Sequence, residues 1–276
     1  MRRPSPHPGP RLCSGLLVGC VIVASLAATA ASAADLPVPA AAPPVAYHPP
    51  IYDWTGIYVG GHVGGGWMND TVTTLATTAL QPTGTVTKVA PMGVLGGAQA
   101  GFNVEFAPVV VGFEGTWTAT SLTGSQQIAS LIALNGQQST DAMPWLATAT
   151  GRIGYAANDL LFYVKGGGAW ARVEYTQTVT IGGGTLLTQQ TLTDNRTGFV
   201  VGGGFEYGMN ENLSIKIEYD YLGFGAKNYT FNNLSGTSNI AGNPPPHDIP
   251  VGAFPFSVKS QLQMLTAGVN YRFTWR

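Results

Sequence analysis

The stretch Leu213-Ser214-Ile215-Lys216-Ile217-Glu218-Tyr219-Asp220-Tyr221 alternates without a break between apolar or aromatic residues and polar or charged ones. Side chains along a β-strand point alternately to two faces, so a strand here has one apolar and one polar face. A helix would instead spread the charges around its whole circumference. Seven further segments alternate in the same way: 55–67, 94–106, 109–118, 145–155, 160–175, 199–207 and 265–273. The sequence therefore predicts eight strands.

The connections between these segments alternate in length. Three are turns of two or three residues, at 107–108, 157–159 and 209–211. Four are long, near 69–91, 119–144, 176–196 and 227–257. Short turns on one side and long loops on the other are typical of outer-membrane barrels. We predict an all-β fold, an eight-stranded antiparallel up-and-down transmembrane β-barrel with both termini in the periplasm.

A soluble lipocalin-like barrel is the alternative, because it also has eight alternating strands. Nearly all the charges within the predicted strands share the polar face, whereas a soluble barrel would carry them outside. Aromatic residues also gather near strand ends, as in the girdles of membrane barrels. Both features favour the membrane barrel.

The composition agrees with a membrane protein. Of 276 residues, 45% are hydrophobic and only 10% are charged, where soluble domains average about 25%. The formal charge of −1 argues against a nucleic-acid surface. No stretch after the N-terminal one approaches the roughly 18 consecutive apolar residues that a spanning helix needs.

The N-terminus reads as an export signal. Arg2, Arg3 and Arg11 precede an apolar stretch at 16–30, and Ala31-Ser32-Ala33 fits a cleavage site. We predict a signal peptide at 1–33, cleaved after Ala33 or Ala34, rather than an uncleaved membrane helix. A Pro/Ala-rich periplasmic leader would follow at 34–51 and the barrel at 52–276. Cys13 and Cys20 leave with the signal, so the mature chain has no disulfide and no thiolate metal site.

Strand parity places nine charged side chains inside the barrel. Five acids and four bases almost cancel, which predicts an ion-pair network that plugs the lumen. They are Glu105, Glu114, Arg152, Lys165, Glu206, Lys216, Glu218, Asp220 and Arg272. A selective pore would more naturally carry one sign of charge. Inward glycines such as Gly60 and Gly202 leave room for water, so a narrow porin for small solutes stays open as the alternative.

The sequence predicts no catalytic, cofactor-binding or metal site. The glycine runs are not followed by a helical pattern, which a dinucleotide site requires. The three histidines of the mature chain, His48, His62 and His247, are scattered. A lipid-modifying enzyme using His62 or His247 is the weaker alternative.

The predicted loops are rich in Thr, Gln, Ser, Asn and Gly and carry few charges. These are Asp70, Lys88, Asp141, Asp194, Arg196, Lys227 and Asp248. We expect the loops to hold whatever extracellular ligand specificity the protein has.

Several segments resemble a known family. YDWTGIYVGG at 52–61, GRIGY at 151–155, VGGGFEY at 201–207 and IEYDYLG at 217–223 are similar to small outer-membrane barrels of alpha-proteobacteria. This is the outer-membrane immunogenic, or porin-family, group of the OmpA/OmpX-like eight-stranded superfamily.

The resemblance implies a surface antigen in the Gram-negative outer membrane, in contact with its lipids and lipopolysaccharide. It also implies delivery by the barrel-assembly machinery through terminal aromatic residues, here Tyr271 and Phe273, although Thr274-Trp275-Arg276 follow. We expect a monomer with a structural or surface-interaction role, and neither catalysis nor nucleic-acid binding.

Overall fold

The computed structural model describes residues 52–76, 82–128, 136–181, 185–232, 235–238, 247–250 and 253–273. The predicted signal peptide (1–33) and leader (34–51) lie outside the described residues. Among the described residues no helix is long and apolar enough to cross a membrane. The strands are β1 (Gly56–Thr74), β2 (Val86–Val89), β3 (Met92–Phe106), β4 (Val109–Ile128), β5 (Gly136–Ala157), β6 (Leu160–Ile181), β7 (Thr185–Gly208), β8 (Leu213–Phe231), β9 (Ser235–Ser238), β10 (His247–Pro250) and β11 (Phe254–Phe273).

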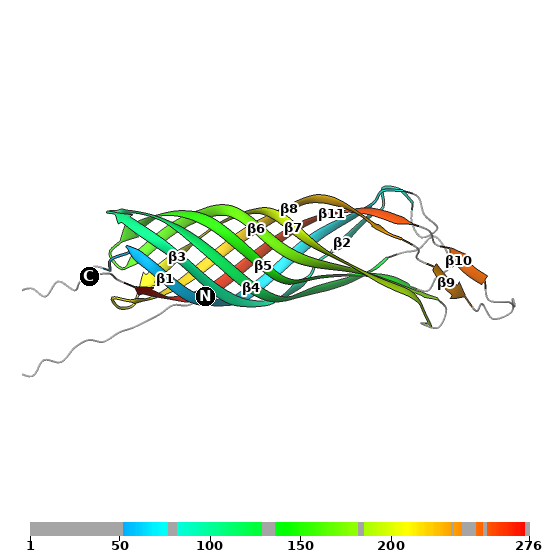
Figure 1. The fold of residues 1–276 in the computed structure, drawn as a ribbon, viewed down its shortest axis with the longest axis horizontal. Helices are drawn as coiled ribbons and strands as arrows, with labels where there is room; N and C mark the ends of the chain where they lie inside the picture. Colours follow the sequence, from blue (N-terminus) through cyan, green and yellow to red (C-terminus); the bar gives the residue numbers. More distant parts are fainter. Residues whose placement is uncertain are drawn as a thin grey trace, which may run out of the picture. The chain divides into compact units, whose positions relative to one another are not determined.

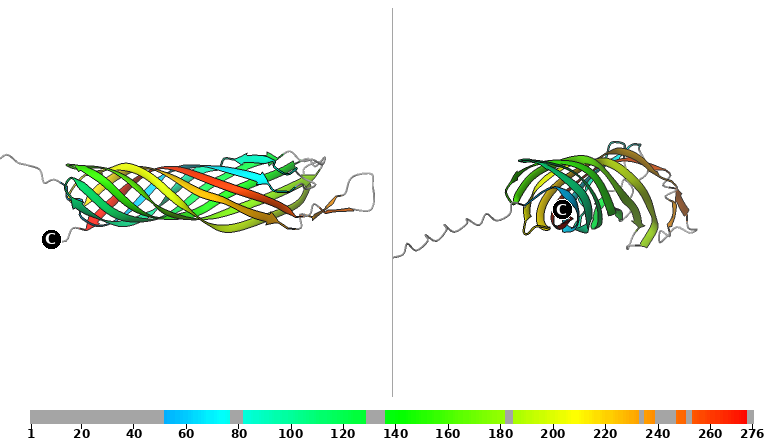
Figure 2. Two further views of the ribbon diagram at one scale, coloured as in Figure 1. Left: turned by 90° about the horizontal axis from the view of Figure 1, so that it is seen from above. Right: turned by 60° about the vertical axis from the view of Figure 1, so that its left-hand side comes forward.

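Eight long strands close into an antiparallel ring (Figure 1; Figure 2). The order is β11-β8-β7-β6-β5-β4-β3-β1, and β1 pairs with β11 from Ile57↔Phe273 to Thr74↔Phe256. The short β2 pairs with the outer part of β1, while β9 and β10 form a separate hairpin. Closure gives each ring strand a neighbouring strand on both sides. Backbone N–H and C=O groups in the bilayer core must bond within the protein, because no water is available there. The predicted eight-stranded barrel is confirmed.

An apolar band surrounds the half of the barrel that carries the short turns. Its outward side chains include Val59, Val63, Val164, Val201 and Ile217, all well exposed. Aromatic residues border the band on both sides. Trp67, Trp117, Trp170 and Phe199 lie toward the long-connection end, and Tyr155, Phe162, Tyr207, Tyr271 and Phe273 toward the short-turn end. This band marks the membrane-spanning segment.

The strands continue far beyond the band, which corrects the predicted long loops. They span 15 to 24 residues in the ring, whereas about 9–11 suffice to cross a bilayer. Segments 69–74, 119–128, 136–144, 176–181, 185–196, 227–231 and 254–257 are strand rather than loop. The alternation in these segments is real but changes phase. All of the odd-numbered residues from 191 to 201 on β7 face outward. Thr191, Thr193, Asn195 and Thr197 make this outer face polar, whereas Phe199 and Val201, nearer the short turns, make it apolar.

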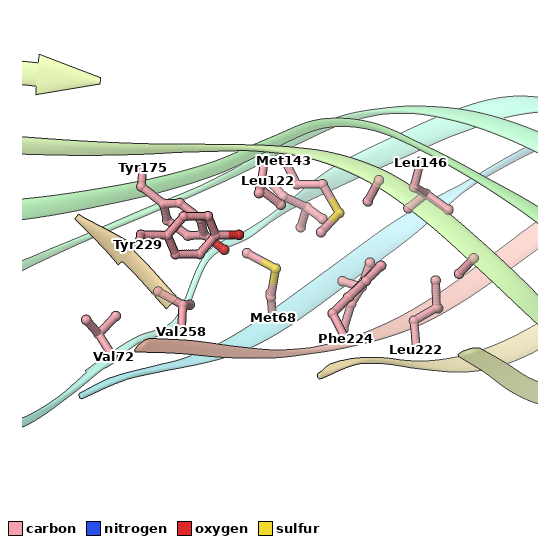
Figure 3. Packing of buried hydrophobic residues seen from close by; sticks show 14 of the residues in the cluster. Met68, Val72, Leu122, Met143, Leu146, Tyr175, Leu222, Phe224, Tyr229 and Val258 are labelled. Atoms are coloured by element: carbon pink, nitrogen blue, oxygen red, sulfur yellow. The ribbon is translucent and has the colours of Figure 1, made fainter. Parts of the chain in front are cut away.

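The outer half of the barrel therefore has the reverse polarity of the membrane half. Its interior is filled by an apolar cluster to which nearly every ring strand contributes (Figure 3). Aromatic rings stack within it, with Phe256 5.0 Å from Phe231 and 5.6 Å from Tyr229 between ring centroids. Below it, in the membrane half, the interior is polar and the outside apolar. The outer half resembles a soluble barrel placed on top of a membrane barrel.

Three predicted loop charges lie inside this outer barrel. Asp70, Asp141 and Arg196 are each at most 4% exposed, because their strand positions share the inward parity of the apolar cluster. Lys88 faces outward on β2, as expected for a surface charge, whereas Lys227 is exposed on the inner face of β8 beside the half-buried Asp194. Asp248 and His247 lie in β10, and their side chains fall outside the described part of the chain.

The ring is open along one seam of the outer barrel. β7 and β8 pair only from Phe199↔Gly223 to Gly208↔Ser214, and in Figure 1 their outer ends lie apart. Side chains bridge the seam instead. Asp194 accepts hydrogen bonds from Lys227 Nζ at 2.6 Å and Tyr229 Oη at 2.7 Å. The Arg196 guanidinium donates to the carbonyls of Gly225 on β8 and Val258 on β11, at a point where β8 has a β-bulge.

The packed outer interior gives a first prediction. Phe256→Ala removes the ring that stacks on Phe231 and Tyr229, so we expect a loss of about 3–5 kcal/mol in the free energy of unfolding. Thr197→Ala, on the outer face, should change it by less than about 0.5 kcal/mol. Urea unfolding of the refolded barrel in micelles measures both. Equal effects would show that the outer interior is not packed.

Candidate functional site: the charged lumen

Glu114 on β4 is the centre of the membrane-embedded lumen. Its carboxylate lies 2.9 Å from Lys216 Nζ, 3.7 Å from an Arg152 nitrogen and 3.8 Å from Lys165 Nζ. Tyr58 Oη donates a further hydrogen bond to it at 2.9 Å. The Glu114 side chain is fully buried. One carboxylate thus gathers cations from β5, β6 and β8, which ties together strands on several sides of the ring.

A second cluster of charges lies beside Glu114. Lys165 Nζ is 2.5 Å from Glu218 and 3.0 Å from Asp220, and Lys216 Nζ is 3.4 Å from Glu218. Tyr163 Oη donates to Glu218 at 2.7 Å. The two lysines are therefore shared between Glu114 and the carboxylates of β8, and the pairs form one connected network rather than separate bridges.

The third part of the network lies toward the short turns. Arg152 is 3.4 Å from Glu206, and its Nε donates to Asn103 Oδ1 at 2.8 Å. Glu206 also accepts hydrogen bonds from Ser214 at 2.5 Å and Asn270 at 2.9 Å. The guanidinium of Arg152 lies over the ring of Tyr58, 4.7 Å from its centroid. These contacts supply the additional hydrogen bonds without which a buried ion pair is unfavourable.

Seven of the nine predicted lumen charges meet in this network, and two lie below it. Arg272 is buried between the rings of Tyr52 and Trp54, 4.6 Å and 5.0 Å from their centroids, and donates to the Asp53 carbonyl. Glu105 is half-buried at the rim and accepts from the Trp54 amide at 3.0 Å. The network holds four acids and three bases. With the nearby Arg272, the buried charges in the membrane half of the lumen are four acids and four bases.

Residues 52–54 form a cap over the short-turn end of the lumen. Trp54 is fully buried; its indole donates to the Asn158 carbonyl at 3.3 Å, and the Tyr52 amide donates to Asp159 at 3.2 Å. The cap is thus fastened to the β5–β6 turn. Strand alternation does not predict this cap, because residues 52–54 precede the first alternating strand.

At three inward glycines, a polar side chain of a neighbouring strand occupies the space that a side chain at the glycine would take. A side chain at Gly101 would collide with Tyr58, one at Gly202 with Asp220 and one at Gly60 with Asn270. Each glycine therefore makes room for a large polar side chain from a neighbouring strand. This corrects the expectation that these glycines leave space for water.

Neutral polar side chains complete the lumen, and the charge count alone missed their role. Tyr58, Asn103, Tyr163, Ser214 and Asn270 each bond a network charge. All share the inward parity of their strands, so alternation could have revealed them. His62 also lies here, with ring nitrogens 2.5 Å from Gln99 Oε1 and 2.9 Å from Thr118 Oγ1. His48 falls outside the described residues.

A separate polar pair lies inside the outer barrel, beyond the apolar band. The carboxyls of Asp70 and Asp141 face each other, and Ser139 donates to Asp141 at 3.4 Å. The remaining three carboxylate oxygens have no other donor. Two carboxylates cannot hydrogen-bond unless one holds a proton. Burial and, after it, the adjacent Asp70 raise the pKa of Asp141 to about 8, which favours the protonated form of Asp141 at neutral pH.

Tyr271 and Phe273 end β11 at the short-turn side of the barrel. Both side chains face outward into the lower aromatic border, with ring centroids 5.2 Å apart. Thr274 to Arg276 fall outside the described residues. An assembly signal at these two residues stays a prediction.

The closed ring, the apolar band and the polar lumen define a small outer-membrane β-barrel protein. The sequence matches the model of the outer membrane protein beta-barrel domain family over residues 21–239. It is 33% identical over 216 residues to the 31 kDa outer-membrane immunogenic protein of Brucella melitensis biotype 1, covering 75% of this chain and 88% of that protein. It is 27% identical over 196 residues to the 25 kDa outer-membrane immunogenic protein of Brucella abortus biovar 1, covering 68% and 73%.

The chain belongs to this family of outer-membrane β-barrel proteins, and its place is the bacterial outer membrane. Among solved structures, OprG of Pseudomonas aeruginosa is similar at 13% identity with a TM-score of 0.47, covering 80% of this chain and 99% of that one. Ail of Yersinia pestis is similar at 15% identity with a TM-score of 0.33, covering 79% and 99%.

The position of Glu114 gives a second prediction. Glu114→Gln keeps the shape but leaves Lys216, Arg152 and Lys165 short of one negative charge, so we expect a loss of about 3–5 kcal/mol in unfolding free energy. Glu174→Gln breaks the exposed Arg172–Glu174 pair at 3.7 Å and should cost less than about 1 kcal/mol. Denaturant unfolding in micelles tests both, and similar losses would contradict a central role for Glu114.

The Asp70–Asp141 pair gives a third prediction, on pH. An acid whose pKa is raised in the folded state contributes stability at low pH that is lost as pH rises toward that value. The wild-type barrel should therefore lose stability between about pH 4 and pH 8 through this pair. Asp141→Asn mimics the protonated form and should be more stable than wild type at pH 8.5 by at least about 1 kcal/mol. The two should be similar near pH 4.

Thermal unfolding across this pH range, followed by circular dichroism, measures the difference. Glu211→Gln, at the exposed β7–β8 turn, is the control for loss of one negative charge. If wild type and Asp141→Asn have parallel pH profiles, the pair does not share a proton.

Proposed function

We propose that this protein is a closed structural barrel of the outer membrane that displays a rigid extracellular platform, without catalysis or steady solute transport. Family membership supports an outer-membrane role, and the lumen supports closure. The observation that carries the proposal is the filling of the interior at three successive levels.

The first level is the cap of Tyr52 and Trp54 around Arg272. The second is the neutralised network around Glu114, in which lysines and arginines bridge across the lumen rather than lining one wall. The third is the apolar cluster of the outer barrel. A cavity of only about 10 Å³, room for one water molecule, lies between that cluster and the Asp141 region. An ion would have to displace side chains at each level in turn.

The outer barrel supports a display role. A packed interior holds the strands rigid beyond the bilayer, so the outermost connections are carried well above the lipid surface. Their exposed neighbours on the strands are mostly Thr, Ser, Asn and Gln, for example Ser121, Thr123 and Thr193. Such a surface suits contact with extracellular ligands through hydrogen bonds rather than through strong charge.

We further infer a monomeric barrel that is inserted by the barrel-assembly machinery through Tyr271 and Phe273. Against an enzyme, we note that His62 is engaged by Gln99 and Thr118 inside the lumen, away from either opening. The narrow porin is the competing function, and closure of the lumen separates the two.

The fourth prediction tests closure. The refolded mature protein in a planar bilayer should show no steady conductance steps at 1 M KCl. Arg152→Ala should destabilise the barrel yet stay silent, because Trp54 and the outer apolar cluster still fill the lumen. A variant combining Trp54→Ala, Arg152→Ala and Phe256→Ala should conduct.

Insertion is verified on the same membranes by heat-dependent mobility on gels. Steady conductance steps from inserted wild-type protein would contradict the proposal and establish the porin instead.

A further inference from the structure

The exposed lysines of the barrel are concentrated on one side. The chain has five lysines, of which Lys165 and Lys216 lie in the lumen. The other three, Lys88, Lys227 and Lys259, are exposed on β2, β8 and β11. These strands and β1 are neighbours in the sheet, in the order β2-β1-β11-β8 (Figure 1).

Strand register places two of these lysines in one row. Thr71 on β1 pairs with Lys88 on one side and with Lys259 on the other. All three side chains point outward, so the lysines flank Thr71 about two strand spacings, roughly 10 Å, apart. Lys227 on β8 is not part of this row: it pairs in register with the inward Val258, and its Nζ lies 2.6 Å from Asp194 at the β7–β8 seam.

No acidic group balances Lys88 and Lys259. The only carboxylate on β1, β2 and β11 is Asp70, and it points into the barrel. No ion pair to either lysine is formed within the described part of the chain. The outward cation on the other side of the ring, Arg172, does have a partner in Glu174 at 3.7 Å. This face is therefore positive, although the chain as a whole has a formal charge of −1.

The height of the row fits the headgroup layer of the outer leaflet. Thr71 is four residues beyond Trp67, which belongs to the upper aromatic border. For a strand tilted by about 40°, that is roughly 10 Å above the border. Lysine stems can lie along the barrel and reach down toward lipid phosphates from this height.

We propose that Lys88, Thr71 and Lys259 bind the phosphate groups of the phosphorylated glycolipid in the outer leaflet, lipid A. Two unpaired ammonium groups and a hydroxyl at one level match a phosphorylated sugar headgroup in charge. The apolar band directly below, with Trp67 and Leu265 exposed, accommodates its acyl chains. The site would bind lipid A of the outer leaflet to one side of the barrel.

The test is a titration of the refolded protein in neutral micelles with diphosphoryl lipid A, followed by the shift in unfolding temperature. K88Q/K259Q should bind about 30-fold more weakly than wild type, and each single variant about 5-fold. R172Q/K227Q removes the same charge from exposed sites that are already paired, so its affinity should match that of wild type. Dephosphorylated lipid A should bind the wild type as weakly as lipid A binds K88Q/K259Q.

Three results would overturn the proposal. Unchanged affinity in K88Q/K259Q would exclude these lysines, and equal binding of dephosphorylated lipid A would exclude phosphate. Binding of soluble heparin more tightly than lipid A, lost in K88Q/K259Q, would make the row a site for soluble polyanions instead. Heat-dependent gel mobility verifies that each variant is folded.

Discussion

Hydrocarbon surrounds the lower half of this barrel, and closure of the sheet is the condition on which everything else depends. Each backbone N–H and C=O in the membrane must bond within the protein, which eight antiparallel strands achieve only by returning β11 to β1. Closure at eight strands makes a narrow interior that side chains fill. Charges placed there must neutralise one another, and the pairing of Glu114 with three cations does so.

The same strands contact lipid in the membrane half of the barrel and water in the outer half. Below Phe199 and Trp67, apolar residues face lipid and polar ones fill the lumen; above them polar residues face outward and apolar ones fill the interior. On β5 and β8 a β-bulge, near Trp145 and near Gly225, also shifts which positions point inward. Where closure fails above the membrane, between β7 and β8, long side chains replace the backbone ladder. Arg196 satisfies carbonyls on two strands there. Outside the membrane, water can hydrogen-bond the unpaired backbone groups along this seam, whereas hydrocarbon in the membrane could not.

Alternation predicted the strand count, the topology and the membrane location, because period two is dictated by strand geometry. It also placed Glu114, Arg152, Lys165, Glu206, Lys216, Glu218 and Asp220 inside. The outer barrel was missed because the apolar residues change parity near Trp170 and Phe199, which looks like the end of a strand. Asp70, Asp141 and Arg196 were consequently taken for loop charges. Tertiary contacts such as the Tyr52–Trp54 cap leave no periodic signal.

The exchange of faces along β7 is the central claim, and cysteine scanning tests it most directly, because the predicted mature chain contains no cysteine. Single cysteines at outward positions 191, 193, 195, 197, 199, 201, 205 and 207 are labelled in liposomes with a membrane-impermeant maleimide. The structure predicts labelling from 191 to 197 and protection by lipid from 199 to 205, while 192, 196 and 200 stay protected in the interior. Protection of 191–197, or labelling at 199 and 201, would contradict a barrel that extends beyond the bilayer with inverted polarity.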